Sequence, residues 1–538
     1  MGIPSYFSHI VRKHRNIIKK YSSSNISIDN LYLDCNSIIY DSVRLIKGVK
    51  NTRTFEKKLI KTVCEKIVYY IEEIAPQQRV YIAFDGVAPV AKLEQQRNRR
   101  YKSWFEKELC EKLREEDSSD KSISHSEQQD PSIDWNTVSI TPGTKFMKDL
   151  GNGVRAFFKN KAAFGLEEII VSPSDKEGEG EHKIYEYIRD NADYHNNTAT
   201  AIYGLDADLI MLTLNHLHIS NKLYLFRETP HFIKSIDKSL DPNTNYLMDI
   251  PELGEMLKRD LSLDSCKINN AVILDYILLC FFLGNDFMPH FPSLNIRTDG
   301  INHLLGAYRS TILAKNLYLT DGRKIVWKNL RKLVEYLSEN EHDYLKAEYV
   351  KRRKMRPRHC QEDEDRILAR LMDVPILDRT CEEYINPSES GWRNRYYKEL
   401  FDIDIDRERC KQICKNYLEG MEWTINYYTR GCKDWRWTYR YEYPPLLTDL
   451  VRHIPHFDTE MLVKQPKNPV KDLVQLSYVI PRPYLNLLPS KLHKKLLEKC
   501  DHLYRTDCKI VWAYCRYLWE AHAILPHIDI GKLEHLLN

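Results

Sequence analysis

Features that would assign this chain of 538 residues to a membrane or secreted class are missing from it. No apolar run is long enough to span a bilayer, and we find no signal peptide. Tyr6 stands where a myristoylation signal needs Ser or Thr, which excludes that lipid anchor. The 13 cysteines are an odd number without framework spacing, so we expect reduced thiols. These absences predict an intracellular protein without a membrane partner, in the cytoplasm or, as the alternative, in the nucleus.

A strong net charge is also missing. The 80 Lys and Arg residues nearly balance 76 Asp and Glu residues, which leaves a formal net charge of +4. A surface for nucleic acid must therefore come from local clusters of basic residues. The chain does have 43% hydrophobic and 11% aromatic residues, which is typical of a well-packed protein and not of a disordered one. Its length predicts two or three packed units.

Short β-prone runs, several of them ending in Asp, alternate with helical stretches in the first part of the chain. The runs are 31–34, 80–85, 168–171 and 200–206, and the helical stretches include 54–74 and 181–190. This alternation predicts an α/β fold with a mainly parallel sheet flanked by helices. Ligands of such sheets bind beyond the carboxyl ends of the strands. After about residue 325 the alternation stops, and the pattern predicts a mostly helical C-terminal block packed on the sheet.

Two polar segments interrupt this organisation. Residues 117–132 have almost no apolar content and predict a mobile loop. The stretch 339–368 is densely charged, with Lys351-Arg352-Arg353-Lys354 followed by an acidic run, and we expect a flexible or extended connection there. Its basic part, Lys351 to Arg358, is either a solvated or RNA-facing surface or a nuclear-import signal.

A set of carboxylates gives the strongest chemical indication. Asp34 and Asp85 each end a strand, and Asp208 lies where a strand end passes into a helix. Glu179 and Glu181 lie in a glycine-rich turn before a helix. The full set consists of Asp34, Asp85, Glu179, Glu181, Asp206, Asp208 and Asp286. A single Asp is more often a cap or turn residue, but carboxylates that converge at one sheet edge repel one another unless cations neutralise them.

Oxygen ligands of this kind suit Mg²⁺, for which Mn²⁺ can substitute. Two such ions a few ångströms apart support in-line attack on a phosphodiester, so we expect the carboxylates to be catalytic and to bind two Mg²⁺ ions. Zinc fits less well because these carboxylates lack paired His or Cys neighbours at ligand spacing. Cys410 and Cys414 are expected to be core thiols on a helix.

A basic helix is expected just after Asp85, over residues 91–113. On it Lys92, Gln96, Arg99 and Arg100 share one face, because they lie at i, i+4, i+7 and i+8. These side chains can grip a terminal phosphate through charge-assisted hydrogen bonds, some of them bidentate. The alternative is a solvated basic face, but the position beside a metal site favours phosphate binding.

These residues resemble the Xrn family of 5′→3′ exoribonucleases, whose core is similar to that of the flap-endonuclease-like, PIN-related α/β nucleases. The resemblance spans nearly the whole chain, and motifs in this number and order are specific. In the first part it is carried by Met1-Gly2-Ile3-Pro4, Asp34-Cys35-Asn36, Phe84 to Lys92, Gln95 to Arg100, Ile140 to Thr144, Gly178 to Ile184, Gly204 to Leu212 and Leu283 to His290. In the second part it is carried by Gly391-Trp392, Tyr396 to Lys398, Trp435 to Pro445 and Gln475 to Pro481.

The resemblance implies a nuclease domain over 1–330, a charged helical linker over 331–390 and a helical domain over 391–538. It also implies metal binding by the carboxylates, a 5′-phosphate pocket on the basic helix, and base stacking by Tyr40 and Trp437, with Trp435 as the alternative to Trp437. Three positions depart from the family's usual residues: Tyr40 stands for His, Val90 for Arg and Glu177 for Pro. Tyr40 keeps an aromatic ring for stacking but does not offer the protonation of an imidazole.

The expected activity is processive, Mg²⁺-dependent hydrolysis of 5′-monophosphorylated single-stranded RNA to 5′-mononucleotides, in mRNA decay or other RNA turnover. We expect a monomer of a minimal Xrn form, with a decapping enzyme as a partner that acts upstream. Two other functions remain alternatives. A flap endonuclease acting on DNA would follow the last Asp with a glycine-rich helix-hairpin-helix, whereas Asp286 is followed by Phe287 to Leu294 without it. A catalytically silent RNA-binding scaffold would have lost carboxylates that this chain keeps.

Overall fold

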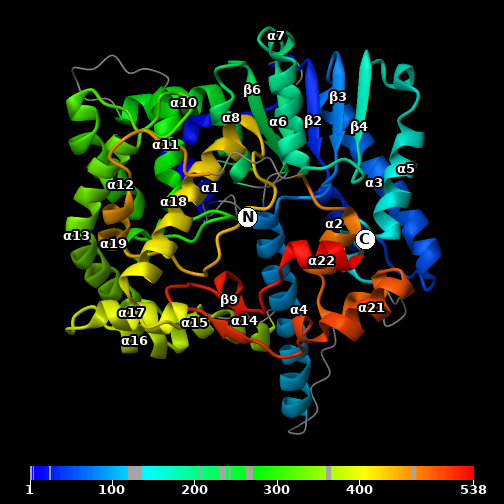
Figure 1. Cartoon of the computed structure of the whole chain (residues 1–538). Coiled ribbons are helices and arrows are strands. Elements are labelled where there is room, and N and C mark those ends of the chain that lie inside the picture. Colours follow the sequence, from blue (N-terminus) through cyan, green and yellow to red (C-terminus); the bar gives the residue numbers. More distant parts are fainter. Residues whose placement is uncertain are drawn as a thin grey trace.

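Our computed structural model describes residues 3, 5–22, 26–118, 135–204, 207–228, 238, 240–241, 244–261, 271–358, 365–462 and 468–537. A sheet with the strand order β1-β7-β6-β5-β2-β3-β4 lies in its first half (Figure 1). The strands from β6 to β4 run parallel, while β7 is antiparallel to β6 and β1 to β7. The predicted mainly parallel sheet is confirmed, and the antiparallel edge adds to it. The bounds are β1 (Ile18–Lys20), β2 (Asn30–Asp34), β3 (Arg79–Ala83), β4 (Glu168–Ser172), β5 (Thr200–Tyr203), β6 (Leu223–Arg227) and β7 (Tyr246–Asp249).

Helices cover both faces of the sheet, because alternate strand side chains enter two different cores. On β2, Leu31 and Leu33 are buried with helices α2, α3 and α5. Tyr32 points to the opposite face, where α1, α6, α8, α10 and α11 lie. On the first face the helices are α2 (Asn36–Leu45), α3 (Thr52–Ile74) and α5 (Lys145–Phe157), and on the second α1 (Tyr6–Lys13), α6 (Gly180–Asp190), α8 (Asp208–Asn215), α10 (Ile250–Leu261) and α11 (Ala271–Phe281); the short α7 (Ala192–His195) follows α6.

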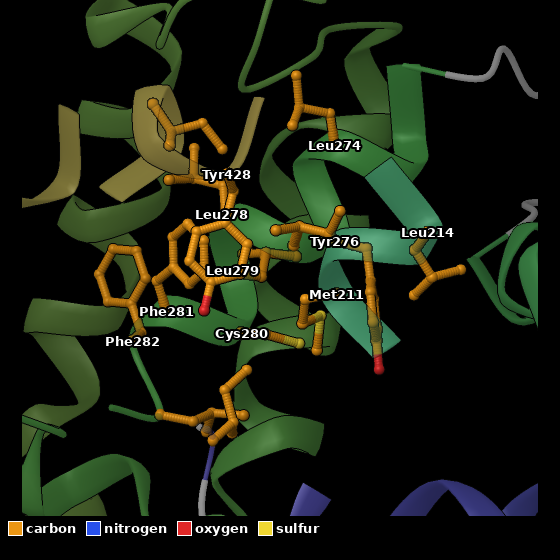
Figure 2. Close-up of a cluster of buried hydrophobic side chains, with 14 of the residues drawn as sticks. Met211, Leu214, Leu274, Tyr276, Leu278, Leu279, Cys280, Phe281, Phe282 and Tyr428 are labelled. Atoms are coloured by element: carbon orange, nitrogen blue, oxygen red, sulfur yellow. The ribbon is translucent and has the colours of Figure 1, made fainter. Parts of the chain in front are cut away.

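The core on the α6 side continues into the helical block. Figure 2 shows this cluster, in which Met211 of α8 and Cys280 of α11 lie near Tyr428 of α18. The rings of Phe281 and Tyr428 are 5.1 Å apart between centroids. The sheet and the helical block therefore share one hydrophobic core, which fixes α18 relative to the strand ends. The helices of this block are α12 (Gly300–Thr311), α13 (Trp327–Lys354), α17 (Trp392–Phe401), α18 (Arg407–Arg430) and α19 (Leu447–Leu450), the last continued by the 3₁₀ turn η6 (Val451–His453).

The long helix α4 (Val90–Ser118) confirms the predicted basic helix and projects away from the sheet (Figure 1). One side of α4 binds a late segment of the chain, because buried Arg97 donates to the carbonyls of Pro526 at 2.8 Å and Leu503 at 3.4 Å. Asn98 exchanges two hydrogen bonds with Ala523. The elements around α4 are α20 (Asp472–Val479), α21 (Ser490–Cys500), α22 (Ile530–Leu537) and the antiparallel pair β8 (Lys509–Val511) and β9 (His522–Ile524).

The flexible or extended connection expected over 339–368 is wrong for its first part, because α13 continues as a helix to Lys354. Arg352 is buried and makes two hydrogen bonds to Glu382, at 2.9 and 2.6 Å. Buried Glu341 accepts hydrogen bonds from the amides of Leu447 and Thr448. Charges that suggested solvent exposure thus have partners distant in the sequence. Short helices follow: α14 (Arg366–Met372), α15 (Val374–Leu377) and α16 (Thr380–Ile385).

Several predicted features lie outside the described residues. Positions 119–132 of the predicted loop and positions 359–364 of the charged stretch are among them. So are Leu205 and Asp206, so that the strand predicted over 200–206 is described only to its end at Tyr203 and the residue after it. The domain boundaries at 330 and 390 stay a prediction, and α13 crosses the first of them. No helix in the described parts of the chain is long and apolar enough to cross a membrane.

Candidate active site

Asp34 and Asp85 lie side by side at the carboxyl ends of β2 and β3, as the sequence predicts. Both face the first turn of α6: a Cβ atom on Gly180 would lie 2.5 Å from Asp34 Oδ1 and 3.5 Å from Asp85 Oδ1. The Gly180 amide donates to Asp85 Oδ1 at 2.7 Å. Only glycine allows this approach, so the turn before α6 brings its acidic residues to the strand ends.

Asn36, at the start of α2, fixes the orientation of Asp85. Its Nδ2 donates to Asp85 Oδ2 at 2.5 Å, and its Oδ1 accepts from the Asp85 amide at 3.1 Å. The sequence comparison placed Asn36 in a motif but gave it no role. In the structure its two hydrogen bonds hold the Asp85 carboxylate in one orientation at the edge of the sheet.

Glu179, Glu181 and His182 form a compact group at the start of α6. Each can offer one ligand atom, and these atoms all lie within 4.8 Å of one another. The sequence analysis expected no paired His or Cys neighbours here, and one histidine, His182, joins the two glutamates. Burial lowers the pKa of His182 well below its ordinary value, which keeps the ring neutral and able to act as a ligand. Burial, together with the charge of Asp85, raises the pKa of Glu179, although Lys92 opposes this.

Lys92, on the first turn of α4, lies between two of the predicted metal ligands. Its Nζ is 2.5 Å from Glu179 Oε2 and 2.7 Å from Asp286 Oδ2, and all three side chains are largely buried. Burial alone would raise the pKa of Asp286, but the ammonium of Lys92 outweighs it and holds that pKa well below its ordinary value. The structure thus brings Asp286 to the carboxylates and places a cation among them.

Asp208 opens α8 and is 3% exposed. Tyr428 of α18 hydrogen-bonds to it, and burial followed by the charges of Asp208 and Glu181 raises the pKa of Tyr428 well above its ordinary value. The charge of Asp286 also raises the pKa of Tyr428. The Tyr428 hydroxyl therefore lies close to three carboxylates. Buried carboxylates this close together suit a divalent cation, whose charge would offset their repulsion.

A row of stacked rings leads from α18 into the acidic group. Trp437 stacks on Trp423 with centroids 5.2 Å apart, and Trp423 stacks on Tyr427 at 4.8 Å. Tyr427 then stacks on His182 at 3.7 Å and donates a hydrogen bond to Glu179 Oε1 at 2.8 Å. Trp437 is 7% exposed and one of its faces is covered by Trp423, so only its other face or its edge is available to a base. Trp435 is half-buried, and its carbonyl accepts a hydrogen bond from Val90.

The predicted phosphate-binding residues continue along α4 from Lys92. Gln96 is buried, Arg99 is exposed, and Arg100 is half-buried. Burial lowers the pKa of Arg100 to about 10, while Tyr40 of α2 opposes this shift, which places the two side chains in one environment. The Arg100 Nε is buried and has no hydrogen-bond partner among the described residues. Phosphate binding and base stacking stay predictions.

A cavity of about 430 Å³ opens next to this centre. Asp286 and Arg99 line it at one end, and Gln95 and His290 lie in its wall. Arg297 and Glu520 line another part of it and form an ion pair. The cavity therefore connects the α4 helix and Asp286 with the segment around residues 513–527.

The structure therefore brings together Asp34, Asp85, Glu179, Glu181, Asp208 and Asp286, while Asp206 lies outside the described residues. The sequence analysis did not assign roles to His182, Tyr427 and Tyr428. His182 directly follows a predicted ligand, which could have identified it. Nothing in the sequence places Tyr427 next to Glu179, because the two are 248 residues apart.

Comparisons with known proteins identify the family of the chain. Residues 1–229 match the family described as XRN 5′-3′ exonuclease N-terminus, and residues 266–373 and 376–538 match the Xrn1 helical domain. The chain is 25% identical to 5′-3′ exoribonuclease 2 of Gallus gallus, covering 100% of this chain and 70% of that protein. It is 27% identical to 5′-3′ exoribonuclease 1 of Saccharomyces cerevisiae, covering 99% of this chain but 43% of the yeast protein.

Among solved structures, the catalytic core of Rad2 in complex with DNA aligns with a TM-score of 0.33 and 14% identity, covering 92% of this chain and 98% of that one. The family matches cover both the sheet that carries the carboxylates and the helical block that carries α18. On these matches, and with the acidic centre assembled as the resemblance implied, the chain belongs to the Xrn family of 5′-3′ exonucleases.

Proposed function

We propose that this protein is a Mg²⁺-dependent 5′→3′ exoribonuclease that degrades single-stranded RNA bearing a 5′-monophosphate to 5′-mononucleotides. The observation that carries the proposal is the geometry of α4. At its start Lys92 contacts Glu179 and Asp286, and two turns later Arg100 presents a buried Nε without a partner in the described part of the chain. One rigid helix thus joins an acidic centre to a basic site for a terminal phosphate.

The proposed metal site consists of the carboxylates already described, with His182 beside them. Two bound Mg²⁺ ions would supply a hydroxide nucleophile and neutralise charge on the leaving oxygen. The single positive charge of Lys92 contacts two of these carboxylates and offsets part of their charge. Asn36 holds Asp85, and the hydroxyls of Tyr427 and Tyr428 hold Glu179 and Asp208. These contacts limit the rotation of the carboxylates and so preorganise the centre.

End selection follows from the distance between the two sites on α4. Lys92 and Arg100 are eight residues apart, which corresponds to about 12 Å along a helix. A 5′-phosphate held by Gln96, Arg99 and Arg100 would therefore place a phosphodiester one or two positions along the strand near the carboxylates. The ring of Tyr40, which lies near Arg100, would stack on the first base of the RNA. RNA that starts with a hydroxyl would leave the arginines unpaired, and a cap would be too large for the site.

The test uses four RNAs of one sequence that differ only at the 5′ end, incubated with the purified full chain and Mg²⁺. We expect rapid digestion of the monophosphate, slow digestion of the hydroxyl, and almost none of the triphosphate or capped RNA. 5′-Mononucleotides should accumulate from the start of the reaction. Comparable cleavage of a circular RNA would contradict an exonuclease, and equal rates on all four ends would contradict a phosphate pocket. A DNA strand of the same sequence tests the choice of sugar.

We also propose that the protein acts as a monomer in mRNA decay or related RNA turnover in the cytoplasm, with the nucleus as the alternative. Such an enzyme needs an upstream activity that exposes a 5′-monophosphate, and a decapping enzyme supplies that end on mRNA. Sedimentation of the purified chain with and without RNA tests the oligomeric state. Imaging of a tagged chain in cells tests the location.

A further inference from the structure

A second group of metal-ligating side chains lies on α18, at the end opposite to the ring-bearing residues. Cys410 and Cys414 are four residues apart near the start of this helix, so they share one face. His453 comes from η6, which contacts α18. One ligand atom from each of the three side chains lies within 4.8 Å of the other two. The sequence predicted only core thiols here, because His453 is distant in the chain.

The surroundings of this group fit a bound cation. Cys414 is fully buried, whereas Cys410 and His453 are half-buried, which leaves a path from solvent. Asp449 lies one helical turn before His453, and its charge acts on Cys410, Cys414 and His453 alike. The Tyr397 hydroxyl donates to Asp449 Oδ2 at 2.9 Å, and Arg452 lies 3.4 Å from Oδ1, so the carboxylate is held in place.

We propose that Cys410, Cys414 and His453 bind one Zn²⁺ ion, with a water molecule from the solvent side as the fourth ligand. Two sulfurs and an imidazole are ligand types that zinc takes in tetrahedral sites. Mg²⁺ and Mn²⁺ prefer oxygen ligands, so this site and the catalytic centre would select different ions from one solution. The inference rests on these residues alone and does not depend on the proposed exoribonuclease activity.

Such an ion would join α18 to the segment formed by α19 and η6. Of the two ligands on α18, Cys414 lies 13 residues before Tyr427, about 20 Å along the helix, and Cys410 lies one turn farther away. Tyr427 and Trp423 belong to the row of stacked rings that ends at His182. The zinc would therefore be structural, fixing one end of the helix whose other end contacts the catalytic carboxylates.

The test measures zinc in the full chain, prepared without a polyhistidine tag, loaded with Zn²⁺ and desalted into excess Mg²⁺. We expect one zinc per chain by mass spectrometry of the metal. With Co²⁺ instead, a thiolate-to-cobalt charge-transfer band should appear. Cys410→Ser and His453→Gln should each lose the zinc and the band. Cys508→Ser, which alters a half-buried cysteine elsewhere, and Asp208→Ala, which alters the catalytic centre, should keep both.

The outcomes separate the alternatives. A wild-type chain that binds no zinc, or a cobalt form without the thiolate band, would overturn the site. Retention of zinc by His453→Gln would place the ion elsewhere. Because His453 is only half-buried, His453→Gln should fold, which circular dichroism checks. Chelation should then lower the thermal unfolding midpoint of the wild type but not of this variant.

Discussion

Lys92 and Asp286 are 194 residues apart in the sequence, yet the lysine Nζ lies 2.7 Å from the aspartate Oδ2. The same ammonium contacts Glu179 at 2.5 Å. A residue predicted to bind phosphate thus also lies among the carboxylates of the acidic centre. The Lys92 ammonium and a bound metal ion would therefore compete for the same two carboxylates.

Lys92→Met should destabilise the metal-free protein by about 3 kcal/mol, because two buried carboxylates lose their cation. Mg²⁺ should then stabilise the variant more than the wild type, since no ammonium competes with it. Thermal unfolding with and without Mg²⁺ measures both effects. Lys107→Met, on an exposed part of the same helix, is the matched control and should change neither. Equal Mg²⁺ stabilisation of Lys92→Met and wild type would show that the ammonium and the metal do not share a site.

Asp208→Ala should abolish hydrolysis while RNA affinity and the unfolding midpoint stay close to those of the wild type. Without metal the midpoint should stay level or rise slightly, because one of several mutually repelling carboxylates is removed. Single-turnover assays and RNA binding in Ca²⁺ separate the two effects. Asp193→Ala, an exposed position, should remain active. Near-normal turnover of Asp208→Ala in Mg²⁺ would exclude Asp208 from the metal site.

Arg100→Ala should weaken the preference for a 5′-monophosphate. Loss of a charge-assisted hydrogen bond costs about 1.5–3 kcal/mol, so kcat/KM on monophosphate RNA should fall roughly ten- to hundredfold. The rate on 5′-hydroxyl RNA should change little. Lys112→Ala, exposed farther along α4, should leave the ratio of the two rates unchanged. An equal fall in kcat/KM on both substrates would mean that Arg100 stabilises the fold and does not bind the 5′-phosphate.

With Trp437→Ala, more partly digested RNA intermediates should accumulate, while the first cleavage still occurs. Base stacking contributes about 1–3 kcal/mol per base, so its loss favours release between cuts. Because Trp437 is buried against Trp423, Trp437→Phe is needed to separate stacking from packing. Trp437→Phe should restore most of the number of nucleotides that are removed before the RNA is released. If instead Trp435→Ala produces the intermediates and Trp437→Ala does not, Trp435 is the stacking residue.

Glu341 should make stability depend on pH. Burial raises its pKa to about 7 from an ordinary value of 4.5, although the amides of Leu447 and Thr448 lower it. The folded chain then keeps a proton that the unfolded chain releases, so this contribution to stability falls as pH rises from about 4.5 to about 7 and is constant above that. Relative to Glu341→Gln, the wild type should lose about 3 kcal/mol across the window.

Denaturant unfolding of both chains at several pH values measures this difference. Glu339→Gln, exposed on the same helix, should follow the wild-type profile. Parallel profiles for wild type and Glu341→Gln would contradict the shift.

The sequence was sufficient for features set by local pattern. The strands that end at Asp34 and before Asp85, the helix α4, and the face shared by Lys92 and Arg100 all follow from periodicity and turn residues. It was insufficient where a partner lies far away in the chain. Arg352 belongs to a charged run that suggested a flexible connection, and only its contact with Glu382 explains why it is buried. The short strands β6 and β7 carry little periodicity, so their pairing could not be predicted.

The contacts of α4 also affect the order in which the protein folds during its synthesis. Arg97 and Asn98 reach carbonyls of residues 503–526, more than 400 positions later in the chain. During translation, α4 leaves the ribosome early, but the groups that cover its structural side are synthesised near the end. Domains usually fold in the order of synthesis, N-terminal first. Here the helix that carries the basic residues can settle only after the late segment has emerged, so a nascent chain stalled before residue 503 should not yet present a complete end-binding site.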